Sequence, residues 1–244
     1  MNTIPQLKAE IAAYLQREVS EFYDNGIDLL LTAINSAHTE AQKHRDFELA
    51  KCTVDIPVSL TRGAPMGVAK LHGTETVVSL KKILRAAYSD HDGILPLEFT
   101  TQGSEAYNRW LRNRAGYSWS PPLQQDLISL GQVIQSGTQL YFYGGAAFGG
   151  QDPAPLMFDA IRLFPDYSDD EAATSNKDDF LLQYGYEYMF WFALCRLNYR
   201  NKEFVQREEG NVSPPKDERK DAWDKLIAWD ASLIYSGDTS IDLD

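Results

Sequence analysis

Residues 178–204 read DDFLLQYGYEYMFWFALCRLNYRNKEF, and this stretch decides how the rest of the chain is interpreted. It contains no proline, and its apolar residues recur at the i, i+3, i+4, i+7 spacing of one helical face: Leu182, Tyr186, Met189, Phe190, Ala193, Leu194 and Leu197. Asp178 and Asp179 open the stretch, where a helix dipole favours negative charge. We predict one helix ~40 Å long. So long and aromatic a helix needs a large surface to bury against, and we expect part of that surface to belong to other protein chains.

Three further amphipathic segments lie near the two ends of the chain. Apolar residues at helical spacing predict helices over residues 3–20, 24–44 and about 215–235. Asn25-Gly26 separates the first two segments, and Asp28 is placed to cap the second helix. Prolines at 214 and 215 precede the last helix.

The middle of the chain has the character of strands. Alternating apolar and polar residues, many of them β-branched, predict strands at 49–60 and 156–164, and a hairpin over 132–143 that turns at Ser136-Gly137. The segment 76–88 fits either a strand or a helix, 94–101 is a short extended piece, and 102–113 reads as a short helix. The glycine-rich segments 61–75 and 144–155 have no periodicity, so we predict loops there.

This order of elements predicts an α+β protein. The four terminal helices are expected to form one four-helix bundle from residues 1–47 and 166–244, because neither helical pair buries enough apolar surface alone. Residues 48–165 are then a β-rich inserted lobe, expected to be a small sandwich or barrel.

Composition and charge narrow the class of protein. The 244 residues carry a net charge of −12, which argues against tight DNA binding but not against a surface that DNA slides past. No run of 18 apolar residues and no secretory signal occurs, so we predict no membrane partner and assembly in a cytoplasm. Cys52 and Cys195 lie in no CxxC pair and are read as reduced thiols.

The sequence offers no recognisable catalytic or cofactor site. It lacks a phosphate-binding loop, a GxGxxG turn and a GxSxG elbow. His38 and His44 are six residues apart, so they do not face each other as a helical metal pair would, and His91 lies in a polar turn. No pair of carboxylates stands in an apolar setting. We therefore predict no enzyme activity, no catalytic residues, no metal and no cofactor.

Two runs carry a resemblance to a known family. The first is GIDLLLTAINSAHTEAQKHRDFELAKCTVDIP at 26–57, a helix with an RDFE exit into a strand; the second is 178–204 followed by AWDKLIAWDASL at 222–233. Together they resemble bacteriophage head–tail adaptor proteins, also called connector or neck proteins, of the tail tubular protein A class. The resemblance lies in hydrophobic patterns and in the order of elements, and it covers both helical ends of the chain.

The resemblance implies a structural role in the virion neck. Such adaptors form a homo-oligomeric ring, usually of twelve copies, beneath the capsid portal protein, and the tail nozzle or tail tube protein binds below. Double-stranded DNA passes through the lumen without sequence-specific binding. The resemblance implies that the last helix and tail dock on the portal, and we expect loops 61–75 and 144–155 to face the tail.

The side chains expected at contacts with other chains are the large apolar ones of the C-terminal part: Tyr186, Phe190, Trp191, Tyr199, Trp223, Trp229, Ile234, Tyr235, Ile241 and Leu243. Other readings stay open at this point. The chain could be a tail terminator or completion protein, a tail-associated hydrolase that uses acids of the insert, or a cellular scaffold without a viral role.

Overall fold

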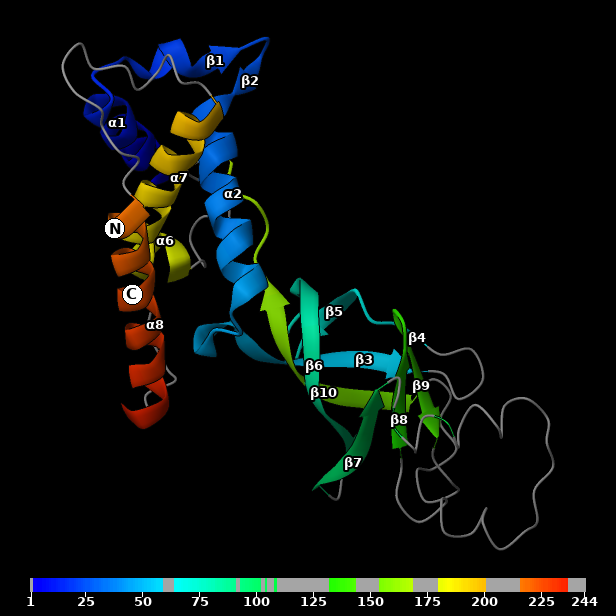
Figure 1. The fold of residues 1–244 in the computed structure, drawn as a ribbon. Coiled ribbons are helices and arrows are strands. Elements are labelled where there is room, and N and C mark those ends of the chain that lie inside the picture. The colour runs from blue at the N-terminus through cyan, green and yellow to red at the C-terminus, as the bar shows by residue number, and fades with distance from the viewer. Residues whose placement is uncertain are drawn as a thin grey trace, which may run out of the picture. The chain divides into compact units, whose positions relative to one another are not determined.

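The computed structural model (Figure 1) describes residues 2–58, 64–90, 93–101, 104, 108, 132–143, 154–168, 180–200 and 216–236. The chain divides into two compact units. Residues 1–49 and 164–244 form the helical unit, and residues 50–163 form the sheet unit.

The helical unit is built from short and long helices around a small hairpin. Its elements are α1 (Ile4–Tyr14), the 3₁₀-helix η1 (Val19–Phe22), β1 (Tyr23–Asp24), β2 (Ile27–Asp28), α2 (Leu29–His44), the 3₁₀-helix η2 (Glu48–Ala50, at the boundary with the sheet unit), α6 (Phe180–Tyr184), α7 (Tyr186–Arg200) and α8 (Lys216–Ser236). Helix α7 is the central one, because α1, α2, α6 and α8 all pack against it. Along α2, the buried residues Ala33, Ala37 and Ala41 recur every four positions, and small side chains on one face let two helices approach closely.

Helix α1 ends earlier than the sequence suggested. We expected a helix over 3–20, but the helix stops at Tyr14, because Gln16 adopts a left-handed conformation with φ of 57°. The N–H groups of Gln16 and Arg17 bond back to the carbonyls of Ala13 and Ala12, the pattern that closes a Schellman motif. Glycine is the usual residue at this position, so a glutamine there gave no stop signal.

The segment between α1 and α2 is a hairpin. Tyr23 pairs with Asp28 and Asp24 with Ile27, so Asn25 and Gly26 form a two-residue loop. Both have positive φ angles, 50° and 80°, as a type I′ turn requires. Helix α2 therefore begins at Leu29 and not at residue 24. The predicted cap is confirmed, because the Asp28 side chain accepts a hydrogen bond from the Leu31 N–H at 2.9 Å.

The sheet unit contains one mixed sheet of eight strands among the described residues. The strands are β3 (Lys51–Val58), β4 (Ala64–Pro65), β5 (Val68–Leu71), β6 (Val77–Asp90), β7 (Gly93–Thr101), β8 (Gln132–Ser136), β9 (Gln139–Tyr143) and β10 (Ala154–Leu163). Their order is β10-β3-β5-β6-β7-β8-β9-β4, with a further pairing between β10 and β6. Only β7 and β8 run parallel; the other described pairs are antiparallel.

Alternation along the strands supplies one core for this unit. Inward-facing residues of β3, β6, β8, β9 and β10 make a single cluster that includes Val54, Ile83, Val133, Phe142 and Phe158. Strand β10 pairs with β3 on one side and with β6 on the other, and the β10–β6 register shifts at Asp159/Ala160 and Ile161/Arg162.

The expected architecture was wrong, although the α+β class is confirmed. The described residues hold five α-helices and a large mixed sheet of eight strands, not a four-helix bundle with an inserted lobe. Two causes explain the difference. The strands join edge to edge into one sheet instead of stacking as two, and the predicted 178–204 helix is divided into α6 and α7 at Gly185.

Gly185 lies close against the preceding turn of its own helix and beside α8. A Cβ built there would lie 2.9 Å from the Leu181 carbonyl oxygen and 3.4 Å from the Leu226 side chain of α8. Backbone hydrogen bonds continue on both sides of it, from Gly185 N–H to Leu181 and from Met189 N–H to Gly185. The helix therefore bends at the point where α8 approaches, rather than ending.

Other local predictions had mixed outcomes. The strands at 49–60 and 156–164 are confirmed as β3 and β10, and 76–88 is strand β6. The 132–143 hairpin is confirmed, but its loop is Gly137-Thr138. The predicted loop 61–75 contains β4 and β5, so it was wrong in part, and most of 102–113 lies outside the described residues. Among the described helices, none is long and apolar enough to span a membrane.

Candidate interaction surface

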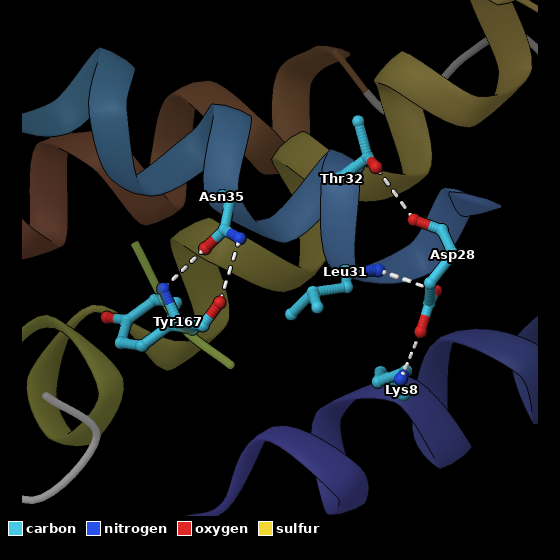
Figure 2. Close-up of polar contacts among 6 residues, drawn as sticks. All are labelled: Lys8, Asp28, Leu31, Thr32, Asn35 and Tyr167. Atoms are coloured by element: carbon cyan, nitrogen blue, oxygen red, sulfur yellow. Dashed lines mark hydrogen bonds and ion pairs between the residues drawn. The ribbon is translucent and has the colours of Figure 1, made fainter. Parts of the chain in front are cut away.

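An ion pair with little solvent exposure fixes the hairpin to the helices on either side of it (Figure 2). The Lys8 ammonium on α1 pairs with the Asp28 carboxylate, and these side chains are only 5% and 9% exposed. The Thr32 hydroxyl donates to the Asp28 carbonyl at 2.7 Å. Burial alone would raise the pKa of Asp28, but the hydrogen bonds from Lys8 and the Leu31 N–H, with the Lys8 charge, hold it below its usual value. Asp28 thus joins α1, the hairpin and α2 at one point.

Two side-chain amides on α2 hold the segment that follows β10. Asn35 donates to the Tyr167 carbonyl at 3.1 Å and accepts from the Tyr167 N–H at 2.8 Å, as Figure 2 shows. Gln42, seven residues along, makes the same pair of bonds with Phe164, at 3.2 and 2.7 Å. Each side-chain amide both donates to the carbonyl and accepts from the N–H of one residue, as the backbone of a paired strand would. It thereby satisfies backbone groups in a part of the chain that is shielded from water.

A third buried polar contact ties the last helix to the end of α2. Asp230 on α8 is 1% exposed, and its carboxylate accepts from the Arg45 guanidinium at 2.7 Å and from the Glu48 N–H at 2.8 Å. The contact spans the end of α2 and the start of η2, just before the chain leaves the helical unit.

A chain of aromatic rings packs α8 against α6 and α7. Trp229 stacks on Tyr184 with centroids 4.1 Å apart, and Trp223 lies 4.9 Å from the ring of Tyr188. The Arg219 guanidinium lies over Phe192 at 5.4 Å. The same series of packed rings includes those of Phe47, Phe164 and Phe180. These contacts are all within one chain, so they stabilise the helical unit by themselves.

A second aromatic group is less completely covered. Tyr14, at the end of α1, meets Phe190 and Trp191 of α7 edge to face, with centroids 5.8 and 5.7 Å apart. Phe190 and Trp191 are half-buried and Tyr14 is 43% exposed. We call these three residues the α1–α7 aromatic surface. Nearby on α7, burial raises the pKa of the Tyr186 phenol and the Glu10 carboxylate raises it further.

The structure distributes the ten predicted contact residues over several environments. Phe190 and Trp191 belong to the α1–α7 aromatic surface, and Tyr186 is half-buried next to it. Trp223 and Trp229 are half-buried in the aromatic chain under α8. Ile234 is exposed on α8. The backbones of Tyr199 and Tyr235 lie in α7 and α8, but their side chains are not among those that the structure describes. Ile241 and Leu243 lie outside the described residues.

Sequence reasoning missed two exposed apolar sites. The hairpin presents Tyr23 and Ile27, which are 51% and 56% exposed. In the sheet unit, Ile94 and Leu95 are exposed at the start of β7. The Asn25-Gly26 turn flanked by an aromatic and a β-branched residue is the signal that could have identified the hairpin.

The net charge is divided unequally between the two units. Residues 1–49 and 164–244 hold 13 Lys and Arg against 26 Asp and Glu, a net charge of −13, whereas residues 50–163 hold 10 against 9, a net charge of +1. The acidic excess of the protein therefore belongs to the helical unit. An acidic surface repels nucleic acid and favours partners with basic surfaces.

The individual side chains with reactive groups are engaged in local contacts. His38 is buried beside Gln42 and the Tyr167 ring, and His44 pairs with Glu40 at 2.7 Å. Burial raises the pKa of both the Cys52 and the Cys195 thiols, which keeps them protonated at neutral pH. Within the described part of the chain, no three His, Cys, Asp or Glu residues gather as metal ligands. His91 lies outside the described residues.

No protein-family model matches this chain, and no curated protein matches its sequence.

Proposed function

We propose that this chain is a virion structural protein that forms a ring adaptor between the capsid portal and the tail of a bacteriophage, with a central channel through which DNA passes. The resemblance of residues 26–57, 178–204 and 222–233 to head–tail adaptors motivates the proposal. Within the helical unit, α2 and α8, which carry two of these runs, pack against α7, which carries the third.

The observation that carries the proposal is the α1–α7 aromatic surface. Tyr14, Phe190 and Trp191 present ring area that one copy of the chain leaves partly in water. Partly exposed aromatic clusters are typical of protein interfaces, where they supply much of the binding energy. In a ring, this surface would lie against the adjacent copy, and the resemblance implies about twelve copies.

The charge distribution supports the same proposal. A channel lined by acidic helical units would repel the phosphates of DNA, so that DNA slides without sticking. The nearly neutral sheet unit would then be the part that meets the tail nozzle or tail tube.

Mass photometry of the purified chain, alone and with the portal protein of the same phage, tests the proposal. We expect a ring, and a larger complex with the portal. Tyr14→Ser should raise the protein concentration at which rings assemble by about tenfold. It removes a partly exposed aromatic ring from the interface and leaves no cavity in the hydrophobic core. Tyr184→Ser is the matched control, because Tyr184 is similarly exposed but stacks on Trp229 within the chain.

The position of the protein in the particle separates the proposal from its closest alternative. Electron cryomicroscopy of virions should place the chain directly below the portal. Density at the far end of a tail tube would indicate a tail terminator instead. If virions lack the chain, and the purified chain is a monomer that does not bind the portal protein, both the adaptor and the terminator reading are contradicted.

A further inference from the structure

The loop of the β1–β2 hairpin places an asparagine directly before a glycine at an exposed tip. Asn25 and Gly26 are both exposed, and their φ angles are 50° and 80°. A Cβ built on Gly26 would meet nothing within 4 Å, so the space beside this residue is open. The side-chain amide of Asn25 and the backbone nitrogen of Gly26 are therefore neighbours at a point that water reaches.

The fold holds neither of these two groups firmly. The hairpin ladder ends at the pair Asp24↔Ile27, which leaves both loop residues outside it. In the described part of the chain, the Gly26 N–H donates no hydrogen bond. The Asn25 side chain donates from Nδ2 to the Asp24 carboxylate at 3.0 Å, and Asp24 is itself exposed. The two groups can therefore move relative to each other without opening the core of the helical unit.

Asn35 also precedes a small residue, but helix α2 and its neighbours hold it in place (Figure 2). Its side-chain amide donates to the Tyr167 carbonyl at 3.1 Å and accepts from the Tyr167 N–H at 2.8 Å. The next residue, Ser36, lies inside α2, and its hydroxyl donates to the Thr32 carbonyl at 2.7 Å. The Asn35 side chain and the Ser36 nitrogen can therefore react with each other only after the helix opens locally.

An asparagine–glycine pair that is free to move can react with itself. The Gly26 nitrogen bonds to Cγ of Asn25 and loses its proton; the bond from Cγ to Nδ2 breaks, and Nδ2 takes up a proton and leaves as ammonia. Glycine favours this attack, which closes a succinimide ring, because it has no Cβ to hinder the approach. Water then opens the ring. Attack of water at Cγ gives an aspartate, and attack at the backbone carbonyl carbon gives an isoaspartate, in which the main chain runs through the side-chain carbon.

We propose that Asn25 is a site of spontaneous deamidation, which changes the hairpin tip from an amide to a carboxylate form as the protein ages. The reaction needs no partner other than water, and the inference is independent of the proposed function. The fold selects the site, because it leaves Asn25 exposed and uses both atoms of the Asn35 amide in hydrogen bonds.

Deamidation changes both the charge and the backbone of the hairpin. The Asp24 carboxylate loses the Nδ2 group that donates to it and gains a carboxylate as its neighbour, and adjacent like charges repel each other. An isoaspartate also adds a carbon atom to the main chain of a two-residue loop, whose length fixes the register of the strands. The Asp24↔Ile27 pair should therefore break in the isoaspartate form.

Peptide mapping by mass spectrometry tests the proposal after the folded chain has been incubated at mildly alkaline pH. Methylation by protein isoaspartyl methyltransferase identifies the isoaspartate. We expect Asn25 to convert faster than Asn35 by about tenfold or more, because Asn35 reacts only in the small fraction of molecules in which α2 is open. In the isolated isoaspartate form, the backbone amides of residues 23–28 should exchange hydrogen faster than in fresh protein.

Two variants serve as matched controls. Asn25→Gly keeps a residue that tolerates positive φ and removes the amide, so its hairpin peptide should yield no isoaspartate. Ser36→Gly creates a second asparagine–glycine pair inside α2, and in the folded chain Asn35 should still convert about tenfold more slowly than Asn25. In urea, both asparagines of this variant should convert at similar rates, because the unfolded chain has no helix that protects Asn35.

If Asn25 converts in urea but stays intact in the folded chain, the turn protects it and the proposal is overturned. If Asn35 of a folded Ser36→Gly variant converts as fast as Asn25, the fold does not select the site, and the proposal is overturned as well. Should this variant fail to fold, equal rates for Asn25 and Asn35 in the unmodified chain have the same meaning. Unchanged hydrogen exchange in the isoaspartate form would leave deamidation standing and overturn the opening of the hairpin.

Discussion

Asp230 and Arg45 are 185 residues apart in the sequence, yet the Asp230 carboxylate accepts a hydrogen bond from the Arg45 guanidinium at 2.7 Å. The same carboxylate accepts from the Glu48 N–H at 2.8 Å and is 1% exposed to solvent. One carboxylate on the last helix therefore satisfies both a charged side chain and a backbone donor at the point where the chain leaves α2. The contact is charge-assisted and sheltered, which makes it stronger than a surface pair.

Replacing Asp230 by alanine should destabilise the helical unit by about 3 kcal/mol, because it leaves the Arg45 charge and the Glu48 N–H without their acceptor. Urea unfolding followed by far-ultraviolet circular dichroism measures the change. Asp224→Ala, on the exposed side of the same helix, is the control and should cost less than about 0.5 kcal/mol. Equal effects of the two substitutions would show that the contact adds no stability.

The Lys8–Asp28 pair should make stability sensitive to acid. Because the pKa of Asp28 is lowered in the folded protein, its contribution is fully present above the unfolded value of about 4 and is lost as the pH falls through the lower folded value. Lys8→Met removes the hydrogen bond and the charge that lower the pKa of Asp28, while burial still raises it, so the variant should lose less of its stability on acidification than the unmodified protein does. Thermal unfolding between pH 2 and 7 measures the difference, and identical pH profiles for both proteins would contradict it.

The amide of Asn35 should protect the segment after β10 from local opening. Asn35→Leu removes both hydrogen bonds to the backbone of Tyr167, at a cost of about 2 kcal/mol. Hydrogen exchange should accelerate at Tyr167, while the amides of β6 keep their protection. Ser36→Ala is the control on the same helix, because the Ser36 hydroxyl donates to the Thr32 carbonyl within α2 and the loss of this bond should be nearly neutral.

Gly185→Ala should strain the junction between α6 and α7. The added methyl group would lie 2.9 Å from a backbone oxygen that cannot move without unwinding α6, so we expect a loss of about 1–3 kcal/mol. Differential scanning calorimetry should show a lower unfolding temperature. Gly67→Ala, where a Cβ would meet nothing within 4 Å, should leave the temperature unchanged or slightly higher.

Local signals predicted many individual elements correctly. Alternation of apolar and polar residues located β3 and β10, and the Asp28 side chain was correctly assigned as the cap of α2. These features depend on residues adjacent in sequence, so a single sequence contains the information needed to recognise them.

The features that the sequence did not reveal depend on contacts between distant residues. The order of the sheet follows from which strands share a core, and β10 pairs with both β3 and β6, with register shifts that no local pattern announces. In the sequence Gly185 looks like an ordinary helix residue, whereas in the structure a Cβ there would lie 2.9 Å from the Leu181 carbonyl oxygen. In the candidate surface, the aromatic side chains of α7 were foreseen, but Tyr14 was not, because its exposure depends on where α1 stops.

The antiparallel pairing of β3 with β10 has an evolutionary consequence. Lys51 lies opposite Ile161, so the two points at which the chain enters and leaves residues 50–163 are neighbours in space. A segment whose ends adjoin can be removed or replaced by recombination without stretching the host structure. Recombination could therefore exchange the sheet unit for another segment whose ends also adjoin, while the helical unit stays intact.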